Sequence, residues 1–367
     1  MDFEKTPSET DLLDLLRQDQ VGLRPLTLTV EEISPYIKHK RPDAFVRAEW
    51  EGARYRFVVE VRRLWTPKAL AEAIDAVRRY ARPPEFYPLV VVPYLPETRL
   101  NDLEEAGVSG IDLCGNGVVV VPGQVLVYRS GHPNRFRSED KIKNVFRGGS
   151  SLVARAFLLK PEYESVQEAE RFIRTRGGAI TLPTISKVSK SLESMLVIDR
   201  TRGEGGAARR LRLLQPDKLL DLLEANYVPP TVTRTIRGKT TFGVEALRER
   251  LASNEAKASR VVQTGFGSVQ NYAVLAAEPM MPFYTSNIDE TLTSLANAFE
   301  VTDRFANVAL SETTDDTVYF DSRPGLVASP LQTYLELAAG DKRSKETASQ
   351  VRRAILEPLE RMRGGEA

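Results

Sequence analysis

The chain has 367 residues, of which 42% are hydrophobic, and its 51 basic and 50 acidic residues leave a formal net charge of +1. This length is typical of two or three domains with ordinary hydrophobic cores, and the balanced charge excludes a protein that is basic over its whole surface. The one cysteine, Cys114, excludes a disulfide framework and a cysteine-rich zinc site, and two histidines alone cannot form a histidine metal centre.

The N-terminal segment, residues 1–19, is acidic and amphipathic, unlike a signal peptide. Its leucines predict a short helix at residues 11–18. No run in the sequence is long and apolar enough to span a membrane. The sequence therefore predicts a cytoplasmic protein without a membrane partner.

Residues 1–133 are interpreted as one α/β domain. Two alternating segments, 43–50 and 55–61, flank Glu51-Gly52 and predict a hairpin. Thr66 and Pro67 then start a helix that runs to about residue 80. The remaining predicted elements are strands at 88–93, 111–113, 118–121 and 124–129, and a helix at 97–106. Strands interspersed with helices in this order are typical of an α/β sandwich.

Residues 134–149 are interpreted as a basic linker. The basic side chains in and beside this segment are Arg135, Arg137, Lys141, Lys143 and Arg147. A solvated connection and a segment that contacts phosphates both fit this composition.

Residues 150–227 predict a winged helix-turn-helix, with the recognition helix as its third helix. Helices around 152–157 and 166–173 come first, and Gly177-Gly178 ends the second of them. Thr181 can cap the next helix, and Pro183 suits its first turn. The apolar stripe of that third helix consists of Ile185, Val188, Leu192, Met195 and Leu196. Its opposite face carries short donors and cations suited to phosphates and base edges, namely Thr184, Ser186, Lys187, Ser189 and Lys190.

A basic hairpin is predicted directly after this helix. Strands begin near residues 196 and 211, with a glycine-rich turn at 203–206, and a further helix follows at 216–227. The arginines of the hairpin are Arg200, Arg202, Arg209, Arg210 and Arg212. Seven Lys or Arg against three carboxylates give residues 182–212 a net charge of +4, so the positive charge is concentrated here. This pattern predicts binding of double-stranded DNA; a solvated basic helix beside a loose hairpin is the alternative.

Residues 231–367, beyond Val228-Pro229-Pro230, predict a third, α/β domain. A Thr-rich strand with Arg234, Arg237 and Lys239 comes first. Helices at 244–251 and 290–299, strands near 281–284, Val308 and Val318, and a helical pair at 329–362 follow. The turn at residues 265–268 is similar to the Gly-Ser turn of nucleotidyltransferases. However, Asp315-Asp316 is adjacent rather than alternating, so both carboxylates cannot face one metal from one strand, and a structural turn is favoured.

Three stretches, residues 106–117, 129–134 and 327–337, carry a resemblance to bacterial regulators built like the AbiEi-family antitoxins of type IV toxin–antitoxin systems. The resemblance implies a winged helix with an AbiEi-like C-terminal domain and, in larger members, an N-terminal domain with a restriction-endonuclease-like fold. It also implies sequence-specific DNA binding, transcriptional control and autoregulation of an operon. A homodimer and a cognate toxin are the corresponding protein partners.

The N-terminal domain also resembles a PD-(D/E)xK nuclease at Pro42-Asp43 and Glu60-Val61-Arg62. Glu60 and Arg62 are two residues apart and share one face of a strand, and Asp43 can lie beside them across the hairpin. In an active enzyme, Asp43 and Glu60 would bind Mg²⁺ and Arg62 would face the phosphate.

The nuclease motif requires lysine where this chain has Arg62, and the bulky, always charged guanidinium is not interchangeable with it. We therefore expect no catalytic residue, metal or cofactor in a nuclease-like domain that does not cleave. The alternative is a Mg²⁺-dependent DNA endonuclease targeted by its winged helix. A third hypothesis is a scaffold that binds another protein.

Overall fold

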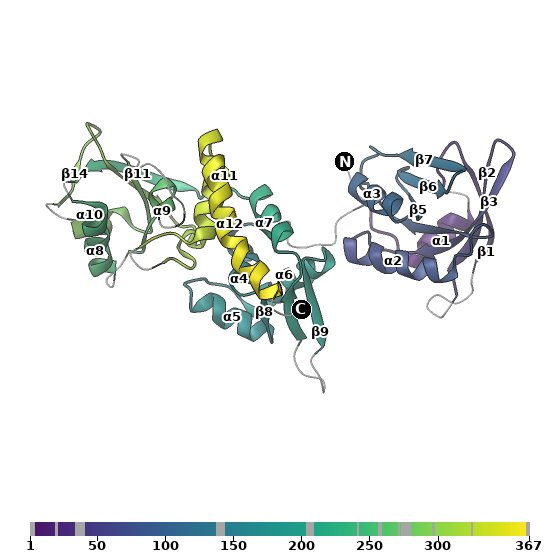
Figure 1. The fold of residues 1–367 in the computed structure, drawn as a ribbon, viewed down its shortest axis with the longest axis horizontal. Coiled ribbons are helices and arrows are strands. Elements are labelled where there is room, and N and C mark those ends of the chain that lie inside the picture. Colours follow the sequence, from purple (N-terminus) through teal and green to yellow (C-terminus); the bar gives the residue numbers. More distant parts are fainter. Residues whose placement is uncertain are drawn as a thin grey trace. The chain divides into compact units, whose positions relative to one another are not determined.

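The computed structural model describes residues 4–18, 21–33, 41–136, 144–202, 209–240, 242–255, 259–270, 272, 280–295, 298–323 and 326–364. The chain divides into two compact units, Met1–Lys141 and Ile142–Ala367. Both units combine helices with strands, so the expected mixed α/β architecture is confirmed (Figure 1). No helix within the described ranges is both long and apolar enough to cross a membrane.

The first unit is built around a seven-stranded mixed sheet. Its elements are α1 (Glu9–Arg17), β1 (Thr27–Ile33), β2 (Ala44–Trp50), β3 (Ala53–Val61), α2 (Pro67–Tyr80), β4 (Tyr87–Val92), α3 (Glu97–Glu105), β5 (Ser109–Asp112), β6 (Gly117–Val121) and β7 (Val125–Arg129). The strands lie side by side in chain order. β3, β4 and β5 run parallel because α2 and α3 connect them as crossovers, and all other neighbours are antiparallel.

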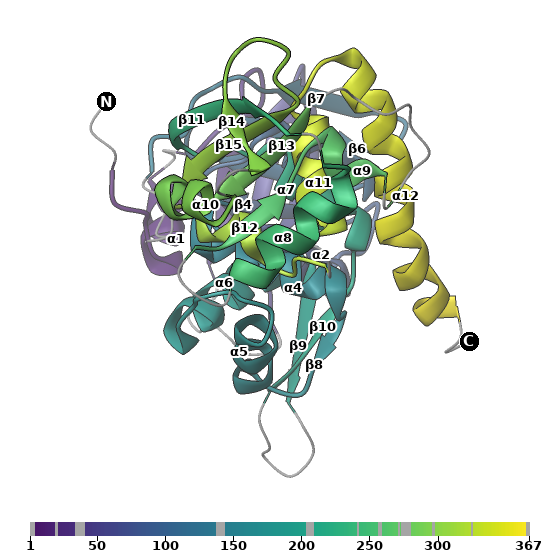
Figure 2. The ribbon, with the colours of Figure 1, turned by 90° about the vertical axis from the view of Figure 1, so that its left-hand side faces the viewer.

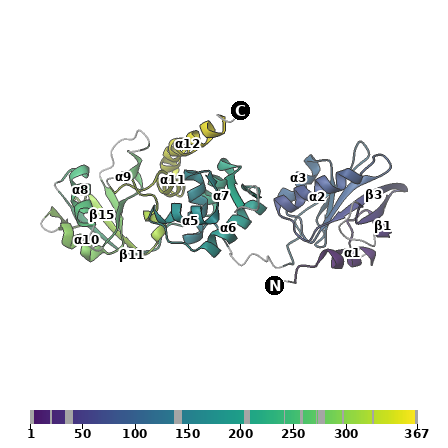
Figure 3. The ribbon, with the colours of Figure 1, turned by 90° about the horizontal axis from the view of Figure 1, so that it is seen from below.

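Helices cover both faces of this sheet (Figure 3). Leu12 of α1 shares a core with Val59 on one face, whereas Val77 of α2 and Leu100 of α3 share a core with Val58 on the other. Adjacent residues of a strand point to opposite faces, so the apolar run in β3 serves both cores. This arrangement explains why β3 and β4 lack a simple apolar–polar alternation.

The sequence missed β1 and the start of α1. β1 contains the run Val30-Glu31-Glu32, and its pairing with β2 shifts register between Val30 and Glu32, which breaks the alternation on which strand prediction depends. α1 begins at Glu9 rather than Asp11 because Ser8 and Asp11 form a capping box.

The second unit begins with a helical part that carries a three-stranded sheet. Its elements are the 3₁₀ helix η1 (Gly148–Ser150), α4 (Ser151–Leu159), β8 (Glu162–Tyr163), α5 (Val166–Arg174), α6 (Leu182–Ser194), β9 (Ile198–Arg202), β10 (Arg209–Leu213) and α7 (Pro216–Ala225). β10 lies between β8 and β9, and all pairs are antiparallel (Figure 2). Gly177 has φ of +79°, which suits glycine and lets the chain turn after α5.

The second unit continues with a five-stranded sheet in the order β12-β13-β15-β11-β14. Its elements are β11 (Val232–Lys239), α8 (Val244–Glu255), β12 (Val261–Gln263), α9 (Phe266–Val269), β13 (Met281–Thr285), α10 (Ile288–Leu295), β14 (Glu300–Val301), β15 (Val308–Thr313), the 3₁₀ helix η4 (Asp316–Tyr319), α11 (Pro330–Ala338) and α12 (Lys342–Gly364). The expected strand near Val318 is wrong. Asp315 caps this segment by accepting from the Thr317 amide, and a 3₁₀ turn forms instead.

One hydrophobic core joins the two parts of the second unit. Leu335 of α11 and Val351 of α12 lie in the same cluster as Phe157 of α4. Of the expected linker, residues 137–143 lie outside the described ranges, whereas Val145 and Phe146 are buried in this core. Helices from the end of the chain therefore support the helices that precede the hairpin.

Candidate nucleic-acid interface

α6 presents two lysines on the side opposite its buried stripe. Ile185, Val188 and Leu192 are fully buried, and Lys187 and Lys190 are exposed. Thr184 and Ser186, the other predicted contacts on this helix, are half-buried. The helical period places these two sets on different sides, as the sequence predicted.

Two expectations about this helix are wrong. Ser189 is buried, and its hydroxyl has no hydrogen-bond partner among the described residues, because a position four residues after Ile185 lies on the buried side. Thr181 makes no side-chain cap bond to the backbone, and its hydroxyl instead pairs with that of Thr184 at 3.0 Å.

The strand register of the hairpin separates its arginines into two groups. Arg200 pairs with Leu211 across the hairpin, so its side chain points to the core side, where it is 5% exposed. Arg200 Nη1 lies 3.4 Å from Glu193 Oε2 on α6. The sequence pattern grouped Arg200 with the DNA-contacting arginines, but the structure uses it to tie the hairpin to α6.

The other face of the hairpin carries Arg210 and Arg212. Arg210 Nε lies 2.7 Å from Glu162 Oε1 on β8 and 3.4 Å from Glu164 Oε1. Sequence reasoning missed both glutamates because β8 has only two residues, too few to show alternation. These carboxylates balance the charge of Arg210 locally.

Arg209 and Arg212 are exposed, and no ion pair joins either of them to a described residue. Arg202 lies opposite Arg209 in the strand register, but its side chain lies outside the described part of the structure. Lys187, Lys190, Arg209 and Arg212 are together called the basic surface below; by strand alternation Arg209 lies on the Leu211 face of the hairpin and Arg212 on the opposite face. Within the described ranges, no carboxylate pairs with any of these four cations. Their charge is therefore available to an anionic partner.

The first unit brings together the carboxyl groups that the sequence singled out, Asp43 and Glu60, which are called the carboxylate pair below. Asp43 precedes β2, Glu60 lies near the end of β3, and both are less than one-tenth exposed. Burial, and next the charge of Asp43, raise the pKa of Glu60 to about 7, against the opposing effect of Arg62. Burial also raises the pKa of Asp43, although its Oδ2 accepts a 2.8 Å bond from the Val61 amide.

Arg62 contacts one member of this pair, Glu60. Its guanidinium forms an ion pair with Glu60 and donates to the Val61 carbonyl at 2.9 Å. Glu9 of α1 also lies close enough to raise the pKa of both carboxyl groups. Sequence reasoning missed Glu9, because no spacing rule relates the first turn of a helix to the end of a strand 51 residues later.

These contacts do not fit a magnesium site well. Mg²⁺ requires ionised carboxylates with free oxygens in near-octahedral geometry. Glu60 takes up a proton near neutral pH and its Oε1 is paired with Arg62. Within the described ranges, no three His, Cys, Asp or Glu side chains are arranged to hold a metal ion.

The glycine–serine turn in the C-terminal part makes internal contacts. Gly265 has φ of +55°, and its amide donates to Glu336 at 2.7 Å. Ser268 is fully buried and donates to the Gly265 carbonyl at 2.8 Å. Asp315 lies on a different loop from this turn and accepts a hydrogen bond from the Thr317 amide. These contacts support the structural interpretation of the turn.

No family model, curated protein or solved structure matches the chain.

Proposed function

We propose that the chain is a transcriptional regulator that binds double-stranded DNA in a sequence-specific manner through α6 and the β9–β10 hairpin. The observation that carries the proposal is the basic surface, with its two lysines on one helix and two arginines on the adjoining hairpin. All four are exposed, and none has an ion-pair partner among the described residues. Phosphates of a duplex would supply the missing anions.

The order of elements supports this proposal. α4, β8, α5, α6, β9 and β10, with β10 in the middle of the small sheet, follow the plan of a winged helix-turn-helix. In that plan α6 takes the place of the recognition helix and the hairpin that of the wing. Thr184 and Ser186 are then the hydroxyl donors closest to the base edges.

The resemblance to AbiEi-type antitoxins adds the biological setting. We propose that the protein regulates an operon in the bacterial cytoplasm, as a homodimer or with a cognate toxin as its protein partner. The C-terminal part would then serve in association with a partner, and the buried, internally bonded Ser268 supports a role without nucleotide transfer.

We further propose that the first unit has a nuclease-like architecture and does not cleave DNA. Helix, three antiparallel strands, helix and parallel strand follow one another from α1 to β4, as in the PD-(D/E)xK fold. The Arg62–Glu60 pair supports the lack of cleavage because it occupies a carboxylate that a metal would need. The close approach of Asp43 and Glu60 is the observation that favours the alternative, a Mg²⁺-dependent endonuclease.

The DNA-binding proposal is tested by mapping the protein on genomic DNA and then measuring its affinity for a bound site by fluorescence anisotropy. Arg209→Ala/Arg212→Ala should weaken binding at 0.1 M salt by at least about tenfold and lower the salt slope by about two units. Arg304→Ala, an exposed arginine near β14, is the control and should bind like the unmodified chain. Equal affinity of the double variant and the unmodified chain would reject the proposal.

The cleavage question needs its own assay. Purified protein is incubated with supercoiled and linear DNA in Mg²⁺ and in Mn²⁺, beside Glu60→Ala and Arg62→Lys variants. We expect intact DNA with the unmodified chain. Metal-dependent cutting that disappears in Glu60→Ala would establish the endonuclease instead, and cutting only by Arg62→Lys would show that Arg62 silences the site.

A further inference from the structure

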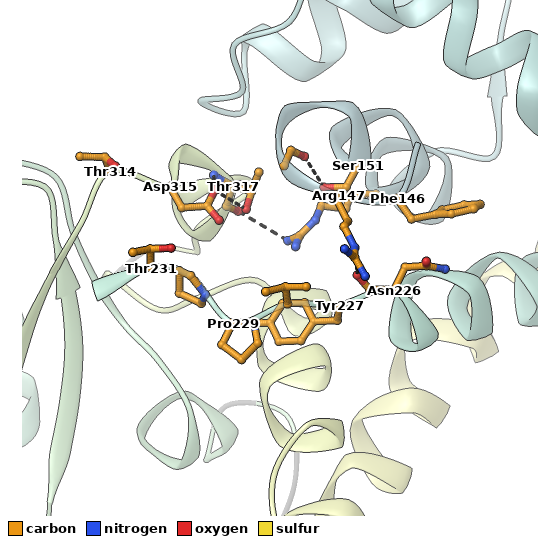
Figure 4. Close-up of a pocket in the computed structure, with 14 residues that line it drawn as sticks. Phe146, Arg147, Ser151, Asn226, Tyr227, Pro229, Thr231, Thr314, Asp315 and Thr317 are labelled. Atoms are coloured by element: carbon orange, nitrogen blue, oxygen red, sulfur yellow. Dashed lines mark hydrogen bonds between the residues drawn. The ribbon is translucent and has the colours of Figure 1, made fainter. Parts of the chain in front are cut away.

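A cavity of about 250 Å³ lies within the second unit, where the start of α4 meets the end of α7 and the loop after β15 (Figure 4). The residues of its lining that bear on the argument are Arg147, Ser151, Arg155, Tyr227 and Asp315. In Figure 4, Arg147 and Ser151 lie above the cavity, Tyr227 lies below it, and Asp315 lies on the side away from Arg147.

Arg155 is the cation at the inner wall of this cavity. It is 3% exposed, and Nη1 donates to Gln332 Oε1 at 2.8 Å and, more weakly, to the Thr317 carbonyl at 3.5 Å. Within the described ranges, no carboxylate forms an ion pair with Arg155, and Nε has no hydrogen-bond partner. The hydrogen-bond partners of Arg155 are neutral, and the carboxylates of Asp315 and Glu336 act on it without forming an ion pair. An anion in the cavity would give this buried guanidinium a direct charged partner.

The start of α4 adds further attraction for an anion. Arg147 precedes η1, and Gly148 and Ser151 at the start of η1 and α4 also line the cavity. The α4 N-cap, Ser150, makes no side-chain cap bond. The positive end of the α4 dipole therefore lies beside the same cavity as Arg155, while the Ser151 amide itself donates to the Gly148 and Gly149 carbonyls. Arg147 is exposed and is positioned by a 3.1 Å bond from its Nε to the Asn226 carbonyl.

Asp315 places a carboxylate at the end of the cavity away from Arg147. Its Oδ1 accepts from the Thr317 amide at 3.0 Å and from the Thr317 hydroxyl at 2.8 Å. No described residue donates to Oδ2. A carboxylate oxygen with spare acceptor capacity suits ligand hydroxyl groups, and it would disfavour an anion at this end.

We propose that this cavity binds a small sugar phosphate. The phosphate group lies at the end formed by Arg147, Arg155 and the start of α4, and the sugar hydroxyls donate to Asp315. Because α4 packs on α5 and α6 in one core, occupancy of the cavity also changes DNA affinity. This second part rests on the proposed DNA-binding function, whereas ligand binding does not.

Ligand binding is tested by calorimetric titration of the full chain with ribose 5-phosphate, and with ribose and acetate as probes that lack the phosphate. We expect ribose 5-phosphate to bind and both other probes to bind at least about tenfold more weakly. Arg147→Ala should weaken ribose 5-phosphate binding about tenfold, as expected for loss of a charged hydrogen bond. Arg155→Gln should weaken it as much or more, and Arg304→Ala is the matched control.

Several results would overturn the assignment. One is the absence of binding to the unmodified chain, and another is acetate binding as tightly as ribose 5-phosphate. A third is an Arg147→Ala variant that titrates like the unmodified chain, a result that does not depend on whether Arg155→Gln folds, because Arg147 is exposed.

The coupling is tested by repeating the anisotropy measurement with and without ribose 5-phosphate. We expect the ligand to change DNA affinity of the unmodified chain and to have no effect on Arg147→Ala at the same concentration. Calorimetric binding with unchanged DNA affinity would overturn the coupling alone. Calorimetric binding by a chain that binds no DNA would overturn the proposed DNA-binding function and leave the ligand site standing.

Discussion

The basic surface and the carboxylate pair are two groups of charged side chains that the sequence singled out, and their surroundings differ. Lys187, Lys190, Arg209 and Arg212 are exposed, with no ion-pair partner in the described structure. In contrast, Asp43 and Glu60 are buried. Asp43 accepts a hydrogen bond from the Val61 amide, and Glu60 forms an ion pair with Arg62.

The difference teaches that partners inside the fold, rather than charge itself, decide which ionic groups remain available. Arg200 and Arg210 make the same point within the hairpin, because each is tied to glutamates of its own unit. An exposed cation without such a partner contributes its full charge to an anionic ligand, whereas a paired cation first loses an existing interaction.

The largest effect on DNA binding is expected when all four cations of the basic surface are removed. Alanine at its four positions should lower DNA affinity on the order of a thousandfold at 0.1 M salt and reduce the salt slope by roughly four units. Fluorescence anisotropy at two salt concentrations measures both quantities. A variant that loses the same charge elsewhere carries alanine at Arg304, Lys342, Lys345 and Arg353, all exposed. A similar loss of affinity in this control would contradict a localised interface.

The carboxylate pair should make the unfolding free energy depend on pH. The pKa of Glu60 is about 7 in the fold against an ordinary value of 4.5, so the folded state binds more protons between these limits. Stability therefore falls as pH rises through this window, by roughly 3 kcal/mol in total.

Glu60→Gln removes this titration. Between pH 5 and pH 8, the unfolding free energy of the unmodified chain should fall by roughly 3 kcal/mol more than that of the variant, as measured by urea denaturation. Glu105→Gln, at an exposed position of the same unit, is the control. Parallel curves for the Glu60 variant and the unmodified chain would show that burial does not hold a proton on Glu60.

Arg200→Ala should lower the stability of the fold more than it lowers DNA affinity. Its side chain is 5% exposed beside Glu193, so the substitution breaks a largely buried ion pair. The variant should lose roughly 2 kcal/mol of unfolding free energy, somewhat less than for a fully buried pair. DNA affinity measured well below the unfolding temperature should change less than for Arg209→Ala. The reverse order of these effects would place Arg200 at the interface.

The smallest effect is expected for Arg210→Ala. Glu162 and Glu164 already balance this arginine, so its loss should change DNA affinity less than about threefold and stability by at most about 1 kcal/mol. The matched comparison is Arg209→Ala, one residue away and without an ion-pair partner among the described residues, which should weaken DNA binding about tenfold. Equally weak DNA binding by the two variants would show that an ion pair within the fold does not keep an arginine from contacting DNA.

The sequence by itself determined the elements whose periodicity is strong. The apolar stripe of α6, the order of strands and helices from β2 to β7, and the concentration of arginine around residues 200–212 all follow from local patterns. Side-chain direction repeats with a fixed period in helices and strands, so a long, regular segment reveals its own buried face. Short or irregular elements such as β1, β8 and η4 lack enough residues or regularity for that signal.

Only the tertiary structure decided which charged residues are already partnered. Arg200 meets Glu193 because the hairpin folds onto α6, Arg210 meets Glu162 because β8 joins the small sheet, and Arg155 becomes buried where α11 and η4 cover α4. These contacts join residues whose distances along the chain follow no period. The sequence therefore indicates where charge is concentrated, and long-range packing determines which charges are left for a ligand.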